Sequence, residues 1–281
     1  MTIDTRQLNR LKPTLVMAQN KHNFTKSEIK IQYYILANPE NVIYHSLTEL
    51  SEASNVAEAT VLRFFRKLGY KGFQDFKLLL AQELTAEVVP ENSNSYKEKV
   101  KVNMIQALEN THDGIDENEL EASILAISHS NDVVIFGIGA SGIAALDMQN
   151  RLMRIGKNVQ VIIDSHFQMM RATTLNPHSV VIAISLTGGT KDIVDSVKIA
   201  SEKGAKIIAL TNYVKSPLTK YAHHILLGSA KEHPLDSGSL VSKIAQLYVI
   251  DLICTGLSLS QIERAQMIQQ EISENVSEKL Y

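Results

Sequence analysis

The stretch Val180-Val181-Ile182-Ala183-Ile184-Ser185-Leu186-Thr187-Gly188-Gly189-Thr190-Lys191-Asp192 indicates a strand, a loop and the start of a helix. A short apolar run stops at a serine, and the apolar spacing after Asp192 is helical. Two glycines let the backbone N–H groups curl into one hollow, and hydroxyl donors come from Ser185, Thr187 and Thr190. Because a helix N-terminus attracts negative charge, this loop predicts a site for a compact anion such as a phosphate ester.

A second loop of the same kind lies about 50 residues earlier. Residues 132–136 are another apolar strand, and Gly137-Ile138-Gly139-Ala140-Ser141-Gly142 follows before a helix over about 143–154. Serine, threonine and glycine are also ordinary turn and cap residues, so either loop alone leaves both interpretations open. Two such loops at the carboxyl ends of parallel strands favour a ligand site, because ligands bind there in open α/β sheets.

The region around these loops alternates between strand and helix patterns. This alternation predicts an α/β fold, a doubly wound parallel sheet of five strands with right-handed crossovers. Before the sheet, helical segments from about residue 97 to 128 are expected to pack on it. A long apolar helix over 240–257 and an amphipathic helix over 261–277 follow it, and the latter is a candidate dimer contact. The strands are expected at 132–136, 159–163, 180–184, 206–210 and 224–227.

Composition describes a globular protein with room for two domains. The 281 residues are 44% hydrophobic and 21% charged. No N-terminal signal pattern is present, and no apolar run is expected to reach the roughly 18 residues of a membrane span. The single cysteine, Cys254, excludes an internal disulfide and a cysteine-based zinc site. We therefore expect a cytoplasmic protein.

The N-terminal region has a helix-turn-helix pattern. After a first helix over about 6–17, Thr25 and Glu28 form a predicted capping box, and Ser46 caps a short helix over 47–53. Asn55 tolerates the left-handed turn before a second helix over 57–68. Its outer face and the segment after it supply the candidate DNA-binding residues Thr60, Arg63, Arg66, Lys67 and Lys71.

The distribution of charge along the chain supports a DNA-binding role for the N-terminal region. Residues 1–80 hold 11 Lys and Arg against 7 Asp and Glu, whereas the remainder holds 17 against 23. A basic front on an acidic body is typical of a chain that meets nucleic acid at one end. A solvated basic face on a helical bundle is the alternative interpretation of the same residues.

A segment without periodicity separates the two regions. It contains Pro90 and Asn92-Ser93-Asn94-Ser95, which are typical of a linker. The expected organisation is a DNA-binding domain over residues 1–86, a linker over 87–98 and a ligand-binding domain over 99–281.

Both halves resemble one family. Residues 47–84, including Ala59-Thr60-Val61-Leu62-Arg63-Phe64 and Lys67-Leu68-Gly69-Tyr70-Lys71-Gly72-Phe73, are similar to the N-terminal domain of RpiR-type regulators. Four segments resemble the sugar isomerase (SIS) domain of that family. They are the two loops described above, Asp164-Ser165-His166, and Ser242-Lys243-Ile244-Ala245-Gln246-Leu247. Two departures are Ala57, where the family usually has a serine cap, and Thr187-Gly188-Gly189, which replaces Ser-Gly-Glu/Ser.

The resemblance implies a transcriptional regulator, not an enzyme, whose SIS domain senses a phosphorylated sugar. Within the family, the chain resembles the branch that responds to amino-sugar phosphates. This resemblance lies in His166, Lys243 and residues 242–247. The implied partners are a palindromic operator and a second copy, as a homodimer or a dimer of dimers, with no membrane, cofactor or metal. The expected ligand-binding residues are Gly139, Ser141, His166, Ser185, Thr187, Gly188, Thr190 and Lys243.

Two alternative functions stay open at this point. Gly137 to Gly142 matches G-x-G-x-x-G, and Asp164 follows 22 residues later, as in a dinucleotide site. A sugar-phosphate isomerase or lyase needs a positioned acid or base. His166 is the candidate, followed by a group of later residues, Glu232, His233, His223 and His224. No nucleophile triad or metal-spaced cluster is evident, and no catalytic residue is predicted.

Overall fold

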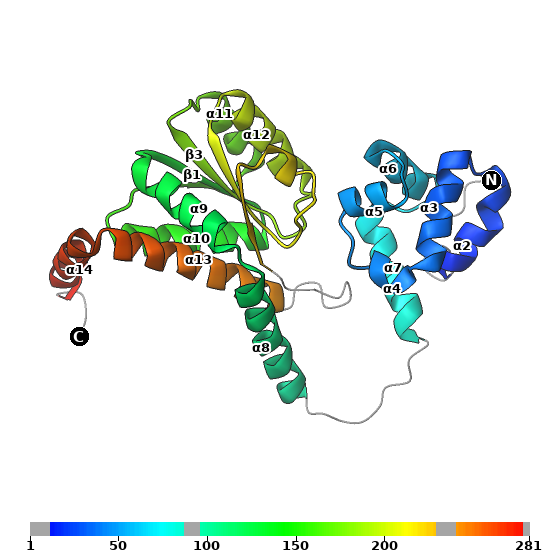
Figure 1. Cartoon of the computed structure of the whole chain (residues 1–281), viewed down its shortest axis with the longest axis horizontal. Helices are drawn as coiled ribbons and strands as arrows, with labels where there is room; N and C mark the ends of the chain where they lie inside the picture. The colour runs from blue at the N-terminus through cyan, green and yellow to red at the C-terminus, as the bar shows by residue number, and fades with distance from the viewer. Residues whose placement is uncertain (1–11, 87–95, 229–239, 278–281) are drawn as a thin grey trace. The chain divides into compact units, whose positions relative to one another are not determined.

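The computed structural model describes residues 12–86, 96–228 and 240–277. The chain forms two compact units, the first reaching Lys99 and the second beginning at Val100 (Figure 1). Part of the predicted first helix, most of the predicted linker, and Glu232 with His233 lie outside the described residues. Each unit is described separately below.

The first unit is helical throughout its described part. Its core contains Phe64, Phe65 and Phe76, all fully buried, and the ring centroids of Phe65 and Phe76 are 4.6 Å apart. This aromatic packing stabilises the contact between the helices over residues 58–67 and 73–86. The elements in chain order are α2 (Pro13–Asn20), the 3-10 helix η1 (Lys21–Asn23), α3 (Lys26–Ala37), α4 (Pro39–Val42), α5 (Leu47–Ala53), α6 (Glu58–Lys67) and α7 (Phe73–Ala86).

The predicted starts of α3 and α5 are confirmed, whereas the predicted start of the first helix lies outside the described residues. Thr25 and Glu28 form a reciprocal capping box at α3, and Ser46 with Glu49 forms another at α5. Asn55 has φ 51° in the turn between α5 and α6, as the helix-turn-helix pattern requires. The N-cap of α6, Ala57, makes no side-chain hydrogen bond. Losing that bond costs a helix about 1 kcal/mol.

The second unit is the predicted α/β domain. Its five strands are all parallel, in the order β2-β1-β3-β4-β5. Each lies within about one residue of its expected position. The elements are α8 (Tyr96–Gly114), α9 (Glu117–His129), β1 (Asp132–Gly137), α10 (Ala140–Met153), β2 (Gln160–Ile162), α11 (Ser165–Thr173), β3 (Ser179–Ile184), α12 (Lys191–Glu202), β4 (Lys206–Thr211), the 3-10 helix η2 (Thr219–Tyr221), β5 (His224–Leu227), α13 (Leu240–Ser260) and α14 (Ile262–Ser277).

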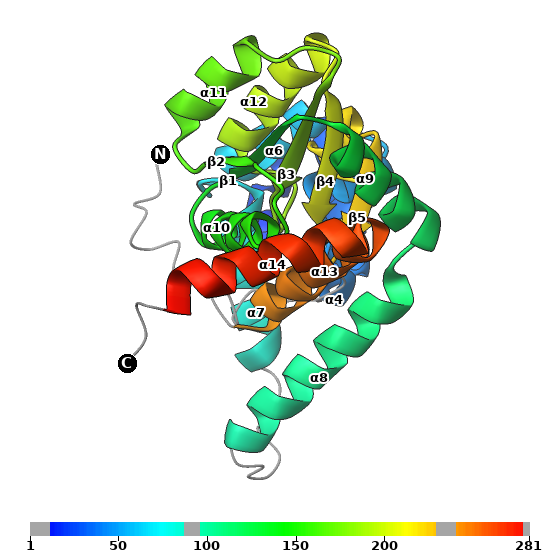
Figure 2. The same ribbon diagram turned by 90° about the vertical axis from the view of Figure 1, so that its left-hand side faces the viewer.

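Helices cover both faces of this sheet (Figure 2). Alternate residues of β1 point to opposite faces, so Val133 and Ile135 join one core cluster while Val134 and Phe136 join another. The first cluster includes side chains of α9, α10 and α13, and the second includes side chains of α11 and α12. The doubly wound architecture is therefore confirmed, with a separate apolar core on each face.

Helix α13 corrects one expectation from composition. It has 21 residues with a mean hydropathy of 1.5 and is long and apolar enough to cross a membrane by those two criteria. However, Val249, Ile250 and Ile253 are fully buried in the cluster that α13 shares with β1 and α10. A core helix that is apolar on most sides passes the same test, because it is buried by protein instead of lipid.

The second unit begins and ends with helices, as expected. Helix α8 begins at Tyr96, within one residue of the helical segment expected from about residue 97, and so includes the last three residues of the range 87–98 that was expected as linker. Helix α14 packs by Ala265, which is buried, and by Ile268, which covers Gly156. It leaves Met267 and Val276 exposed, and its expected role as a dimer contact stays a prediction.

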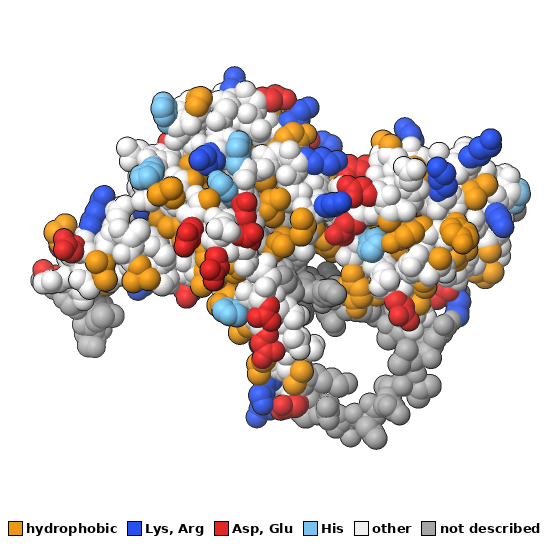
Figure 3. Space-filling model, viewed as in Figure 1, with side chains coloured by type: hydrophobic (Ala, Val, Ile, Leu, Met, Phe, Trp, Pro, Cys, Tyr) orange, Lys and Arg blue, Asp and Glu red, His pale blue; other side chains and the backbone are white. Residues whose placement is uncertain are grey.

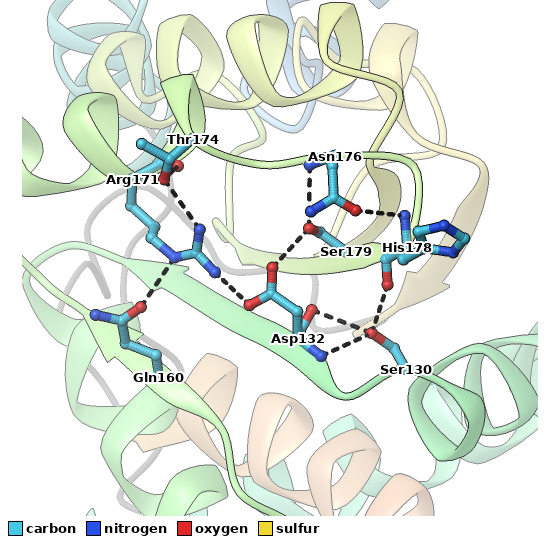
Figure 4. Close-up of polar contacts among 8 residues, drawn as sticks. All are labelled: Ser130, Asp132, Gln160, Arg171, Thr174, Asn176, His178 and Ser179. Carbon is cyan, nitrogen blue, oxygen red and sulfur yellow. Dashed lines mark hydrogen bonds and ion pairs between the residues drawn. The ribbon is translucent and has the colours of Figure 1, made fainter.

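A polar network ties the amino ends of three strands together (Figure 4). The Asp132 carboxylate of β1 accepts hydrogen bonds from Arg171 of α11 and from Ser179 of β3, the latter at 2.6 Å. Arg171 also donates to the Gln160 side chain of β2 at 3.0 Å. Ser130 bonds both the Asp132 backbone and the His178 carbonyl. These contacts lock the end of the sheet that lies opposite the two loops.

This network predicts an acid-dependent loss of stability. Burial alone raises the pKa of Asp132, but Ser179 and Arg171 outweigh it, so the pKa lies below its ordinary value. A lowered folded-state pKa gives stability that is present above the unfolded pKa and lost as the pH falls below about 4. Asp132→Asn should therefore be less stable than wild type at pH 7, and the difference should shrink in acid.

Urea unfolding curves at several pH values measure this difference. Glu121→Gln, which changes an exposed carboxylate of α9, serves as the control and should track wild type. A deficit of Asp132→Asn that stays constant across the pH range would contradict the ionic origin of the stabilisation.

Candidate functional site

The two predicted anion loops lie side by side. Strands β1 and β3 are neighbours, and Gly137 at the end of β1 pairs with Ile184 at the end of β3. The chain turns from β1 toward β2 on one side and from β3 toward β4 on the other. This is the topological switch point, where ligands bind in open parallel sheets. Residues 137–142 and 185–190 therefore follow neighbouring strands at the same edge of the sheet.

Two glycines shape the first loop where it leads into α10. Gly139 has φ +58° and is the N-cap of α10, with no side-chain cap bond. A Cβ on Gly137 would come within 2.7 Å of the Ser141 carbonyl oxygen, so the close turn needs glycine there too. The N–H groups of the first helical turn have no intrahelical partner. They are donors available to an anion at this helix N-terminus.

Three side chains from other helices form hydrogen bonds with this loop. Gln246 of α13 donates its Nε2–H to the Ser141 hydroxyl oxygen at 3.3 Å, which leaves the Ser141 proton to point elsewhere. Lys243, also on α13, donates to the Ala140 carbonyl. Gln168 of α11 donates to the Gly137 carbonyl at 3.3 Å and to the Ile162 carbonyl at 2.7 Å. The loop is therefore anchored to two helices.

Sequence reasoning missed both glutamines as site residues. Each is fully buried, and each has a side-chain oxygen without a hydrogen-bond partner. A glutamine within an otherwise apolar helix stretch, as Gln246 is in α13, is the signal that could have indicated them. Burying an amide without bonds is costly, so such a residue must bond a neighbouring element.

The second loop is a tight turn over Ser185 to Gly188. The Gly188 N–H bonds the Ser185 carbonyl at 3.0 Å, and Gly188 has φ +58°. A Cβ at Gly188 would lie 2.1 Å from the Ser216 Oγ, so both conformation and space require glycine. The loop is fixed to the neighbouring strand because Ser185 donates its N–H to the Leu210 carbonyl at 3.0 Å.

The hydroxyls of the second loop are close to one another. The Oγ of Ser185 lies 3.2 Å from the Oγ1 of Thr190, and the Thr187 Oγ1 accepts the Gly189 N–H at 3.2 Å. Thr190 is the N-cap of α12 but makes no side-chain cap bond. The first turn of α12 thus keeps donors for a ligand, as α10 does.

His166 and Lys243 have different surroundings. His166 is exposed in the first turn of α11, directly after β2. Lys243 is half-buried. Burial lowers the pKa of its ammonium group below the ordinary value, and the negative charge of Asp147 offsets only part of this shift. Asp164 caps α11 by accepting the Phe167 N–H at 3.0 Å. This bond gives Asp164 a structural role.

The predicted DNA-binding residues occupy α6 and the segment after it. Arg63 and Arg66 are exposed. Arg63 donates a hydrogen bond to the Thr60 hydroxyl at 3.0 Å, so Arg63 and Thr60 share one face of α6. Lys71 is exposed after α6. Lys67 differs: its ammonium bonds the Glu28 carboxylate at 2.8 Å and the Asn23 carbonyl at 2.7 Å. It therefore also connects α6 to α3.

Comparisons with known proteins agree with both units. Residues 14–87 match the model of the helix-turn-helix domain of the rpiR family, and residues 126–256 match that of the SIS domain. An uncharacterised HTH-type transcriptional regulator of Haemophilus influenzae is 36% identical over 243 residues, 82% of this chain and 84% of that protein. The transcriptional regulator HexR of Escherichia coli K12 is 33% identical over 87% of this chain and 86% of that protein.

A solved structure matches nearly the whole chain. The Vibrio vulnificus NanR protein complexed with ManNAc-6P has a TM-score of 0.86 and 27% identity, covering 96% of this chain and 100% of that chain. The curated relatives above are regulators, not enzymes. The chain therefore belongs to the rpiR family of helix-turn-helix transcriptional regulators and carries a SIS domain as its second unit.

Proposed function

We propose that this regulator binds a sugar phosphate in the crevice between its two loops, and that the sugar phosphate changes its affinity for DNA. The observation that carries this proposal is the pairing of the loops at the β1–β3 switch point. Two helix N-termini, those of α10 and α12, reach the crevice without side-chain caps. The loops also bring hydroxyls, from Ser141, Ser185, Thr187 and Thr190.

This donor set suits a phosphate monoester. Backbone N–H groups and hydroxyls give strong, charge-assisted bonds to phosphate oxygens, and two helix dipoles favour the negative charge. Neither loop contains an arginine or a lysine, and Lys191, which follows the second loop at the start of α12, pairs its ammonium with the Asp195 carboxylate. Specificity for the sugar must then come from side chains around the rest of the crevice.

We infer that the sugar is an amino-sugar 6-phosphate. The likeness to a NanR structure that contains ManNAc-6P supports this inference, as do His166 and Lys243. His166 is exposed at the start of α11, where it can meet a sugar hydroxyl or acyl group. The alternative of a dinucleotide is less well supported, because a dinucleotide site does not need the second hydroxyl-rich loop at residues 185–190.

The first unit is proposed to read a palindromic operator through Thr60, Arg63, Arg66, Lys67 and Lys71. Two recognition helices related by two-fold symmetry read half-sites about 34 Å apart or a multiple of it. A palindromic site supports our proposal of a homodimer or a dimer of dimers, and a role on DNA supports a cytoplasmic location. The effector alters DNA affinity because it binds two arrangements of the assembly unequally.

A thermal-shift panel tests the ligand class. We expect ManNAc-6P and related amino-sugar 6-phosphates to raise the melting temperature more than glucose 6-phosphate. Unphosphorylated sugars and nicotinamide dinucleotides should have no effect. A larger shift with dinucleotides would contradict the proposal, and product formation from a sugar phosphate would show an isomerase or lyase instead.

Single substitutions then locate the sugar. His166→Ala and Lys243→Ala should weaken effector binding in calorimetry and leave operator binding intact, because both lie in the second unit. Lys198→Ala is the matched control: Lys198 is exposed on α12 and its recorded ion pair is with Glu202. Native effector affinity in both variants would place the sugar elsewhere.

A further inference from the structure

The Ser141 hydroxyl has one hydrogen-bond partner among the described residues. Ser141 is the second residue of α10 and is 7% exposed. Its oxygen accepts the Nε2–H of Gln246 at 3.3 Å. A hydroxyl group carries one proton and two lone pairs. Because Gln246 occupies a lone pair, the Ser141 proton remains for another acceptor.

Gln246 reaches Ser141 from the core of the domain. Charged side chains are spread over the visible face of the second unit, where water solvates them (Figure 3). Gln246 is instead fully buried, as are Val249 and Ile250 on the same helix. Its Oε1 has no partner among the described residues, so the bond to Ser141 is the one its side chain makes there. Since burying an unbonded amide is costly, this bond holds the amide in place.

The packing of α10 on α13 keeps the two groups together. Ala144 of α10 and Ile250 of α13 belong to one apolar cluster. Lys243, one turn before Gln246 on α13, also donates to the Ala140 carbonyl. Because protein cores are close-packed, a shift of Gln246 away from the first turn of α10 would disturb the core on this face of the sheet.

The direction of the Ser141 proton matters for an anion. A phosphate dianion accepts hydrogen bonds and donates none. A hydroxyl that donates to it forms a charge-assisted bond, whereas a hydroxyl that presents a lone pair repels it. An N–H donor on one side of the Ser141 oxygen disfavours the rotamer whose proton points toward Gln246. The proton is thereby available on the side away from α13.

We propose that Gln246 is a positioning residue of the phosphate site, which directs the Ser141 hydroxyl proton toward the bound phosphate by donating to the Ser141 oxygen. This inference rests on the sugar-phosphate site of the proposed function and assigns a role there to a buried side chain that acts through Ser141. A hydroxyl already oriented for its ligand loses less freedom on binding, so the amide raises affinity without touching the anion.

Gln168 provides a matched control in the same domain. It is also fully buried, it bonds the same loop, and its Oε1 has no partner among the described residues. However, its Nε2–H groups donate to the backbone carbonyls of Gly137 and Ile162, at 3.3 and 2.7 Å, and not to a hydroxyl. Loss of Gln168 therefore changes the support of the loop without removing a donor from Ser141.

A double-mutant cycle on effector affinity tests this role. Ser141→Ala should weaken ManNAc-6P binding in calorimetry about tenfold to a hundredfold, because a hydrogen bond to a charged group is lost. Gln246→Met keeps the length of the side chain but removes the donor, and it should weaken binding about fivefold to tenfold. The combined variant should bind no more weakly than Ser141→Ala alone, since the amide acts through that hydroxyl.

The control cycle combines Gln168→Met with Ser141→Ala, and here the two effects on affinity should multiply. Melting temperatures without effector report folding, and Gln246→Leu replaces Gln246→Met if the methionine variant does not fold. Three results would overturn the inference: wild-type affinity of Gln246→Met, a loss that multiplies in full with Ser141→Ala, or equal coupling in the two cycles.

The same measurements separate this inference from the proposed function. If wild type binds ManNAc-6P and Ser141→Ala weakens binding, but the Gln246→Met loss persists in the combined variant, the positioning role alone is wrong. If Ser141→Ala leaves the affinity unchanged, the first loop does not hold the phosphate and the inference falls with that site. If wild type binds no sugar phosphate, the proposed function itself fails.

Discussion

Replacing both Ser185 and Thr187 by alanine is expected to weaken sugar-phosphate binding about a hundredfold to ten-thousandfold. A lost hydrogen bond to a charged group costs about 1.5–3 kcal/mol, and two are removed. The Oγ of Ser185 also lies 3.2 Å from that of Thr190, so the double change disturbs a third hydroxyl. Calorimetric titration with an amino-sugar 6-phosphate measures the loss.

The control for this variant is Ser196→Ala on α12. The Ser196 hydroxyl is fully buried without a hydrogen-bond partner, so its removal should leave effector affinity unchanged. A complementary change, Thr187→Glu, puts a fixed negative charge where the phosphate sits. That protein should bind operator but no longer respond to the effector. A wild-type response from Thr187→Glu would rule out this loop as the phosphate site.

Replacing both Arg63 and Arg66 by alanine is expected to abolish specific operator binding at physiological salt. A base contact from Arg63 contributes about 1–3 kcal/mol per half-site, and each lost phosphate contact lowers the salt slope by about one. Both side chains are exposed on α6, so folding should be unaffected. Mobility-shift titrations at several salt concentrations give both quantities.

Arg154→Ala, an exposed change in the second unit, is the control for charge loss without loss of the α6 face. Lys67 is left in place in this experiment because its bond to Glu28 connects α6 to α3, so its removal would mix stability with recognition. Unchanged operator affinity of the double variant would show that α6 does not read the DNA.

Much of the fold follows from local signals that the structure confirms. Apolar β-branched runs bounded by glycine and serine place the five strands, because a buried parallel strand needs such residues on both faces. The capping boxes at Thr25 and Ser46 and the left-handed Asn55 place helix starts and the turn between α5 and α6. These features depend on a few neighbouring residues, which a sequence displays.

The candidate site is less predictable where it depends on distant residues. The loops themselves are visible as hydroxyl- and glycine-rich turns, but Gln246 reaches Ser141 across 105 positions. Likewise, Lys67 belongs to a basic helix face in the sequence pattern, but the fold brings the Glu28 carboxylate beside its ammonium. Long-range pairing is set by the packing of whole elements, and no local period encodes it.

The anchoring of the first loop has a mechanical consequence. Lys243 and Gln246 lie one turn apart on α13 and bond adjacent residues of α10, Ala140 and Ser141. Two other residues of the same stretch of α13, Ala245 and Tyr248, contact α8. If an anion at the proposed site displaces the α10 N-terminus, α13 would carry that displacement to its contacts with α8. Helix α13 is thus the direct physical connection between the first loop and α8.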